Sequence, residues 1–87
     1  MNIDFRRVYD FAMRNHVEID VTVNDKTYHT EELTITMTKY ISETDKFFYC
    51  KKRFWTEDLQ SLSGSIADIT EAVMRCLEMM LEELEES

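Results

Sequence analysis

A strict alternation of apolar and polar residues runs from Val17 to Asn24. The apolar positions are Val17, Ile19, Val21 and Val23, and the polar ones are Glu18, Asp20, Thr22 and Asn24. This period of two predicts a β-strand with one buried face and one face in water. A single strand leaves its backbone N–H and C=O groups unpaired, so the rest of the chain must supply strands to pair with it.

Two later segments meet that need. After a turn at residues 24–26, Leu33, Ile35 and Met37 share one parity and Thr34, Thr36 and Thr38 share the other, which predicts a strand over Leu33–Ile41. Tyr28 has the wrong parity for this face, so we expect a bulge or loop near Glu31 and Glu32. After a turn at residues 42–45, a third strand is predicted over Lys46–Phe54. Its core side is assigned to Phe48, Cys50 and Phe54 and its outer side to Phe47, Tyr49, Lys51 and Arg53, with the opposite parity left open.

Helices are predicted on both sides of these strands. The first spans Ile3–Arg14 with Asn2 as N-cap, Asn15 in the left-handed conformation at its end, and His16 as a polar cap nearby. Its apolar stripe is Phe5, Val8, Tyr9 and Ala12. A short helical turn follows from Thr56, its cap, to Leu62. Ser65, with Asp68 in a weak capping box, then begins a long helix whose apolar stripe is Ile66, Ile69, Val73, Leu77, Met80 and Leu84, with Cys76 and Leu81 beside it.

The connections between these elements are short. The chain has no proline, and Gly64 is its one glycine. Short turns favour antiparallel pairing of consecutive strands. The sequence therefore predicts a single α+β domain over residues 1–87, with the order αβββα, a three-stranded antiparallel meander, a broken C-terminal helix, and the helices packed on one sheet face.

Composition excludes several classes of function. A net charge of −8 argues against direct binding of nucleic acid or an anionic membrane and favours basic partners. No apolar run approaches a bilayer span and the N-terminus lacks the pattern of a signal peptide, so we expect a cytoplasmic protein. Cys50 and Cys76 sit at apolar positions and are predicted to be reduced core thiols. His16 and His29 lack ligand spacing. We expect no metal site, no cofactor and no enzyme activity.

Acidic residues gather toward the C-terminus. Residues 54–87 hold nine acids against one basic residue, Arg75. Four of the acids repeat at helical spacing away from the core stripe and are called here the acidic row: Glu71, Glu78, Glu82 and Glu85. Neighbours one turn apart are about 5–6 Å from each other, comparable to successive phosphates of a nucleic acid. The row, with Glu57 and Asp58 as possible additions, predicts contact with a groove lined by Lys and Arg. The alternative is a solvated face that maintains solubility.

Two other features allow different functions. Residues 46–55 are rich in both basic and aromatic side chains, and aromatic residues beside basic ones on a sheet can stack bases and pair phosphates. It is equally typical of a core strand whose basic side chains pair with Glu18 and Asp20 or contact an acidic partner. Met79, Leu81 and Leu84 on the last helix offer a surface for self-association, so a homodimer and a structural or accessory role form the alternative hypothesis.

The element order helix–strand–strand–strand–helix resembles that of the double-stranded RNA-binding domain. The last helix here begins Ser65-Ile66-Ala67-Asp68, without the basic residues of that family, so RNA binding is not implied. In size, charge and element order the chain also resembles the small acidic proteins that phages encode against host defence, including anti-CRISPR inhibitors. That resemblance implies a non-enzymatic inhibitor acting in the host cell, which presents an acidic surface to a nucleic-acid-handling enzyme such as a CRISPR nuclease.

Overall fold

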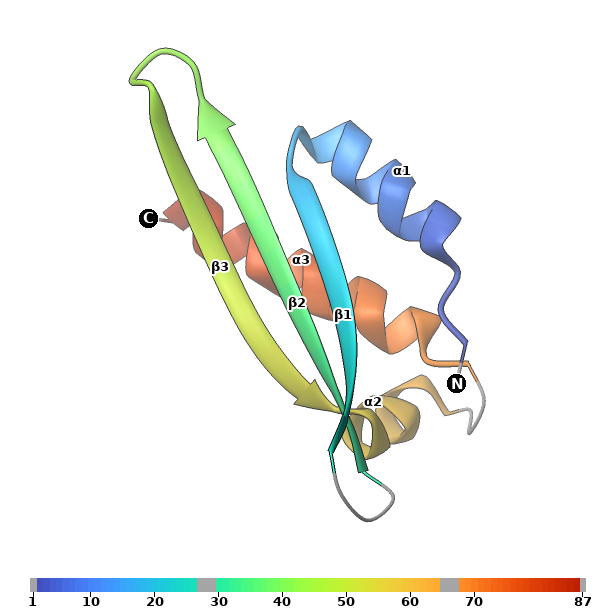
Figure 1. Ribbon diagram of the computed structural model, residues 1–87. Coiled ribbons are helices and arrows are strands. Elements are labelled where there is room, and N and C mark those ends of the chain that lie inside the picture. Colours follow the sequence, from blue (N-terminus) through green and yellow to red (C-terminus); the bar gives the residue numbers. More distant parts are fainter. Residues whose placement is uncertain (1, 27–29, 65–67, 87) are drawn as a thin grey trace.

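The structure is a computed structural model, and it describes residues 2–26, 30–64 and 68–86. The elements follow in the order α1 (Phe5–Asn15), β1 (Glu18–Lys26), β2 (Thr30–Ile41), β3 (Lys46–Trp55), α2 (Thr56–Ser63) and α3 (Thr70–Glu86). The predicted α+β order, with a three-stranded antiparallel meander and a broken C-terminal helix, is confirmed (Figure 1).

The sheet has the strand order β1-β2-β3, and its pairing is regular in the part of the chain that the structure describes. β1 pairs with β2 from Glu18↔Thr38 to Lys26↔Thr30. The bulge or loop predicted near Glu31 and Glu32 is wrong, because both residues belong to β2 and continue this register without a break. Register is set by the apolar sets that share one face, and a one-residue slip would move them all into water. Tyr28, which suggested the bulge, lies outside the described residues.

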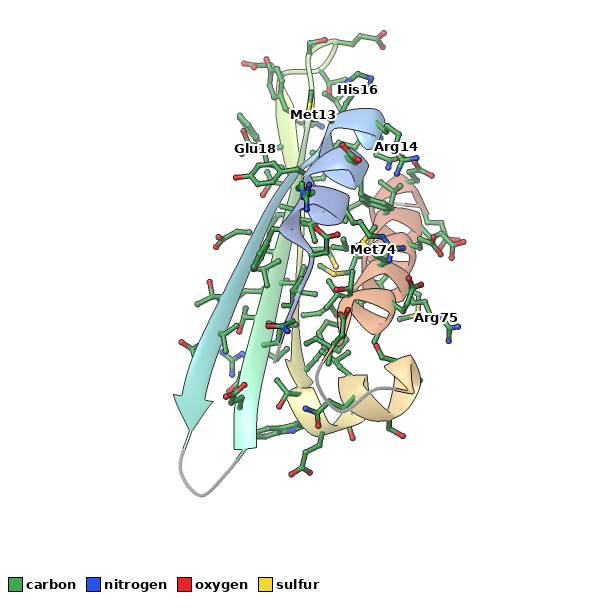
Figure 2. All side chains as sticks on the ribbon, turned by 90° about the vertical axis from the view of Figure 1, so that its right-hand side faces the viewer. Met13, Arg14, His16, Glu18, Met74 and Arg75 are labelled. Carbon is green, nitrogen blue, oxygen red and sulfur yellow. The ribbon has the colours of Figure 1, made fainter. Side chains whose placement is uncertain are left out.

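The helices α1 and α3 lie on the same side of the sheet, here called the inner face (Figures 1 and 2). On β2, the predicted core residues Leu33, Ile35 and Met37 are fully buried. On β3 the predicted parity is also confirmed, since Phe48, Cys50 and Phe54 pack against the core. The stripe of α3 is confirmed as well, over Ile69, Val73, Leu77, Met80 and Leu84, with Cys76 buried and Leu81 half-buried beside it; Ile66 lies outside the described residues.

The first helix differs from its prediction at both ends and in its buried face. Asp4, rather than Asn2, is the N-cap, and its carboxylate accepts a hydrogen bond from the Arg6 N–H. His16, rather than Asn15, adopts the left-handed conformation at the other end. The helix buries Val8 and Phe11, whereas Phe5 and Tyr9 of the predicted stripe are exposed and Ala12 is half-buried. The apolar arc of α1 is wider than the surface that the core can cover.

The broken helix is arranged differently from the prediction. Trp55 is the N-cap of α2 and Thr56 its first helical residue, while Gly64, with φ of 69°, ends it in the left-handed conformation that suits glycine. α3 begins at Thr70, several residues later than predicted. Asp68 therefore precedes the helix instead of completing a capping box inside it, and Ser65 lies outside the described residues.

Candidate protein-binding surface

The start of α3 is fixed to the N-terminal segment by hydrogen bonds. The N–H of Ile69 donates to the carbonyl of Asn2 (3.1 Å), and the N–H of Asp4 donates to Thr70 Oγ1 (2.9 Å). Asp68 Oδ1 accepts from both the N–H (2.9 Å) and the hydroxyl (2.6 Å) of Thr70. These bonds favour the ionised Asp68, and the hydroxyl bond contributes most to lowering the pKa of its carboxyl. The beginnings of α1 and α3 are thereby held side by side.

This arrangement brings the first member of the acidic row against a base. The Arg7 guanidinium donates a hydrogen bond to the Glu71 carboxylate, and the contact lowers the pKa of Glu71 and raises that of Arg7. A polar groove of about 460 Å³ continues between the two helices. Its lining includes Glu78, Arg14 and Arg75. In Figure 2, Arg14 extends from α1 toward α3, while Arg75 points away from α1.

The other end of the row has different surroundings. Glu78, Glu82 and Glu85 are exposed and lie on the side of α3 opposite its core stripe. None of the three forms an ion pair with a residue in the ranges that the structure describes. Steps of three and four residues place them one above the other on successive turns. The row therefore divides into a paired start at Glu71 and an unpaired end, with Glu78 at the border of the polar groove.

Glu83 is part of the same helix but faces the sheet. Its carboxylate accepts a hydrogen bond from Cys50 Sγ (3.2 Å) and forms an ion pair with Lys52 Nζ (3.1 Å). The hydrogen bond from Cys50 is the main cause of a lowered pKa at Glu83, and Lys52 adds to it. Burial, followed by the contact with Glu83, raises the pKa of the Cys50 thiol. Glu83 thus fixes the end of α3 to β3. Its carboxylate does not join the unpaired end of the acidic row.

The additional acids proposed from the sequence lie elsewhere. Glu57 and Asp58 are exposed in the first turn of α2. Figure 1 shows α2 at one end of the sheet and the C-terminal end of α3 toward the other. Glu57 and Asp58 therefore do not extend the unpaired end of the row, and they form a separate acidic patch.

The sheet face away from the helices, here called the open face, carries the outer residues of the basic and aromatic strand. Phe47 and Tyr49 are 70% and 73% exposed. One of the alternatives for this strand, pairing with Glu18 and Asp20, is not found among the residues that the structure describes. β2 lies between β1 and β3, and Asp20 and Lys51 both pair with Thr36. Two strand spacings amount to roughly 9–10 Å. Arg53 instead forms an ion pair with Glu32 of β2, with 3.5 Å between Arg53 Nε and Glu32 Oε1, and Glu32 is buried.

The residues proposed for self-association are mostly covered by the protein's own core. Leu84 is only 7% exposed and Leu81 is half-buried, so Met79 is the exposed member of the three. Among the described residues, no group of three His, Cys, Asp or Glu side chains is placed to hold a metal ion. No described helix has both the length and the apolar character needed to cross a bilayer.

Sequence reasoning missed one surface. Phe5, Tyr9 and Met13 of α1 are exposed along one flank of the helix, beside β1. The signal was present, since α1 carries apolar residues at six of the nine positions from 5 to 13, more than one stripe of a helix contains. Such a helix has apolar surface left over after one face is buried.

No protein-family model, no curated protein and no solved structure matches the chain.

Proposed function

We infer that the protein is a non-enzymatic inhibitor or modulator that binds a basic groove of a nucleic-acid-handling enzyme, such as a CRISPR nuclease, through the exposed end of the acidic row. The observation that carries this proposal is the set Glu78, Glu82 and Glu85, which share one exposed helix face without an ion-pair partner in the described part of the chain. The α3 scaffold holds them in a line at a spacing similar to that of phosphates.

The position of these charges in α3 also favours a role outside the fold. Glu82 and Glu85 lie in the last turns of α3, at the negative end of the helix dipole, where a carboxylate is unfavourable for folding. No basic residue occurs in the last turn. A surface that retains such charges is suited to meet cations on another molecule, and the net charge of −8 would accelerate the encounter.

Affinity capture from host-cell lysate provides the first test. The tagged protein should retain a nucleic-acid-binding enzyme at low salt and release it as salt rises, because exposed charges are screened. Heparin or double-stranded DNA should elute the same enzyme. With that enzyme purified, the protein should displace its nucleic-acid substrate in a mobility-shift assay.

Matched charge reversals then locate the surface. In the triple variant Glu78→Lys, Glu82→Lys, Glu85→Lys we expect affinity for the captured enzyme to fall at least about a hundredfold, since close charge pairs across interfaces contribute several kcal/mol. The control triple variant Glu43→Lys, Glu57→Lys, Asp58→Lys changes the net charge equally at exposed positions elsewhere. Equal losses in both triple variants would show that only net charge matters and would contradict binding through the row.

A further inference from the structure

An open groove runs along the outer edge of the sheet, between α1 and β1. It has a volume of about 610 Å³ and is here called the edge groove. One side is formed by Phe5, Tyr9, Ala12 and Met13 of α1. Tyr9 and Met13 are 70% and 74% exposed, so this apolar flank is open to solvent.

The floor of the edge groove is the edge of β1 itself. Ile19 and Val21, whose side chains point to the inner face, line it together with Glu18 and Asp20, whose side chains point to the open face. A cavity lined from both faces of a strand passes around that strand's edge. In the described part of the chain β1 pairs only with β2, so its other edge has N–H and C=O groups without a strand partner. Such an edge is a template for one more strand.

Side chains around the edge specify what an added strand must carry. Successive residues of a strand point to opposite faces. On the inner side they would meet Phe5, Tyr9 and Ala12, so apolar side chains are required there. On the open side they would lie about 5 Å from Glu18 and Asp20, which are the charged residues in the groove's described lining. Cationic side chains are required on that side.

A second copy of this chain fits these requirements poorly. If β1 of another copy paired with this edge, its Glu18 and Asp20 would join the same open face and add acid to acid. Each copy also carries a net charge of −8, which opposes association. Charge complementarity instead selects a basic partner.

We propose that the edge groove binds an extended peptide segment of a partner protein, in which apolar residues alternate with Lys or Arg, as a fourth strand paired with β1. This surface is separate from the acidic row on α3, and the proposal holds whether or not the row binds an enzyme.

The probe is the synthetic peptide acetyl-Lys-Val-Arg-Val-Lys-Val-Arg-amide, titrated into the full-length protein and followed by NMR. We expect shift changes and slower amide exchange along β1 and shift changes at Tyr9 and Met13. A peptide of the same composition with its valines in one block should bind at least about tenfold more weakly, a difference of about 1.4 kcal/mol. An analogue N-methylated at two adjacent central residues should also bind at least about tenfold more weakly, because the two methyl groups remove an N–H from each edge of the peptide strand. Equal binding of either control peptide overturns the proposal.

Two exposed tyrosines provide matched protein variants. Tyr9→Ala removes part of the groove, whereas Tyr49→Ala removes a side chain of similar exposure on the open face of β3. We expect roughly tenfold weaker peptide binding for Tyr9→Ala and no change for Tyr49→Ala. Peptide affinity should also survive Glu82→Lys with Glu85→Lys, which separates this site from the acidic row. Loss of binding in that double variant, equal effects of the two tyrosine variants, or a dimer in sedimentation that blocks the peptide would each overturn the proposal.

Discussion

The first and last turns of α3 carry the same type of side chain in different surroundings. At the start, Glu71 is paired with Arg7, and Thr70 donates hydrogen bonds to Asp68 and accepts one from the Asp4 N–H of the N-terminal segment. At the end, Glu82 and Glu85 are exposed without an ion pair in the described part of the chain, and only Glu83 is held, by Cys50 and Lys52.

This contrast shows that helical periodicity determines which residues share a face, but not whether their charges are paired within the protein. Glu71 belongs to the same face of α3 as Glu82. The N-terminal segment is hydrogen-bonded to the start of α3, and α1, which follows it, supplies Arg7 there, so Glu71 serves the fold. No comparable base reaches Glu82 within the described residues, so its charge is directed to solvent. The contact that a second element makes decides which acid is structural.

The largest expected difference concerns the core beneath the helix. Leu77 is fully buried, whereas Leu84 near the end is 7% exposed. Leu77→Ala should lower the free energy of unfolding by roughly 2–5 kcal/mol, because it leaves a cavity in close-packed surroundings. Leu84→Ala should cost about 2 kcal/mol, at the lower end of that range, since the site can collapse toward solvent. Urea unfolding measures both, and equal losses would show that the end of α3 is anchored as firmly as its middle.

The hydrogen bonds at the start of α3 come next. Thr70→Val keeps the shape of the side chain but removes the acceptor of the Asp4 N–H and the donor to Asp68. Because these groups lie partly buried, we expect a loss of about 1–3 kcal/mol in unfolding free energy. Thr22→Val on the exposed side of β1 is the control and should change stability little, since valine suits a strand. A loss at Thr22 as large as at Thr70 would contradict this role of the Thr70 hydroxyl.

The acids at the start of α3 should also determine how stability depends on acid pH. The pKa values of Asp68 and Glu71 are lowered in the folded state, so their contribution is complete above the unfolded-state values and is lost as pH falls through the folded-state values. The unfolding free energy should therefore decrease on acidification from about pH 5 downward. The double variant Asp68→Asn, Glu71→Gln should start less stable near neutral pH and show a flatter acid limb. An unchanged acid limb would mean that other carboxyls dominate it.

How far the sequence predicts this fold depends on which surfaces are buried. The alternation in β1 and the parity of Phe48 and Cys50 identified the sheet, because a strand has two faces and only one packs on the core. The α3 stripe was equally clear. The apolar face of α1 was not clear, because its apolar residues cover more than one side of the helix, and only the packing of α1 against the rest of the molecule decides that Phe11 is buried and Tyr9 exposed.

The candidate site was predictable in part for a related reason. Spacing along one helix placed Glu78, Glu82 and Glu85 together correctly. It gave no information on Arg7, which is 64 residues from Glu71 in sequence, nor on the turn of Glu83 toward Cys50. Nor did it show that α2, which carries Glu57 and Asp58, lies at one end of the sheet, away from the C-terminal end of α3. Long-range contacts of this kind depend on tertiary packing, which periodicity does not encode.

The smallest expected effect tests the comparison most directly. Neutralising Glu82 and Glu85 with glutamine should raise the unfolding free energy by roughly 0.3–1 kcal/mol per charge at low salt, because it removes negative charge from the negative end of α3. Neutralising Glu71 should lower stability, since it removes the partner of Arg7. Chemical unfolding at low and high salt measures both signs, and salt should reduce the gain because these side chains are exposed. If glutamine at positions 82 and 85 destabilises the protein, those carboxylates stabilise its own fold. That result would contradict the proposal that the end of the acidic row serves to bind a partner.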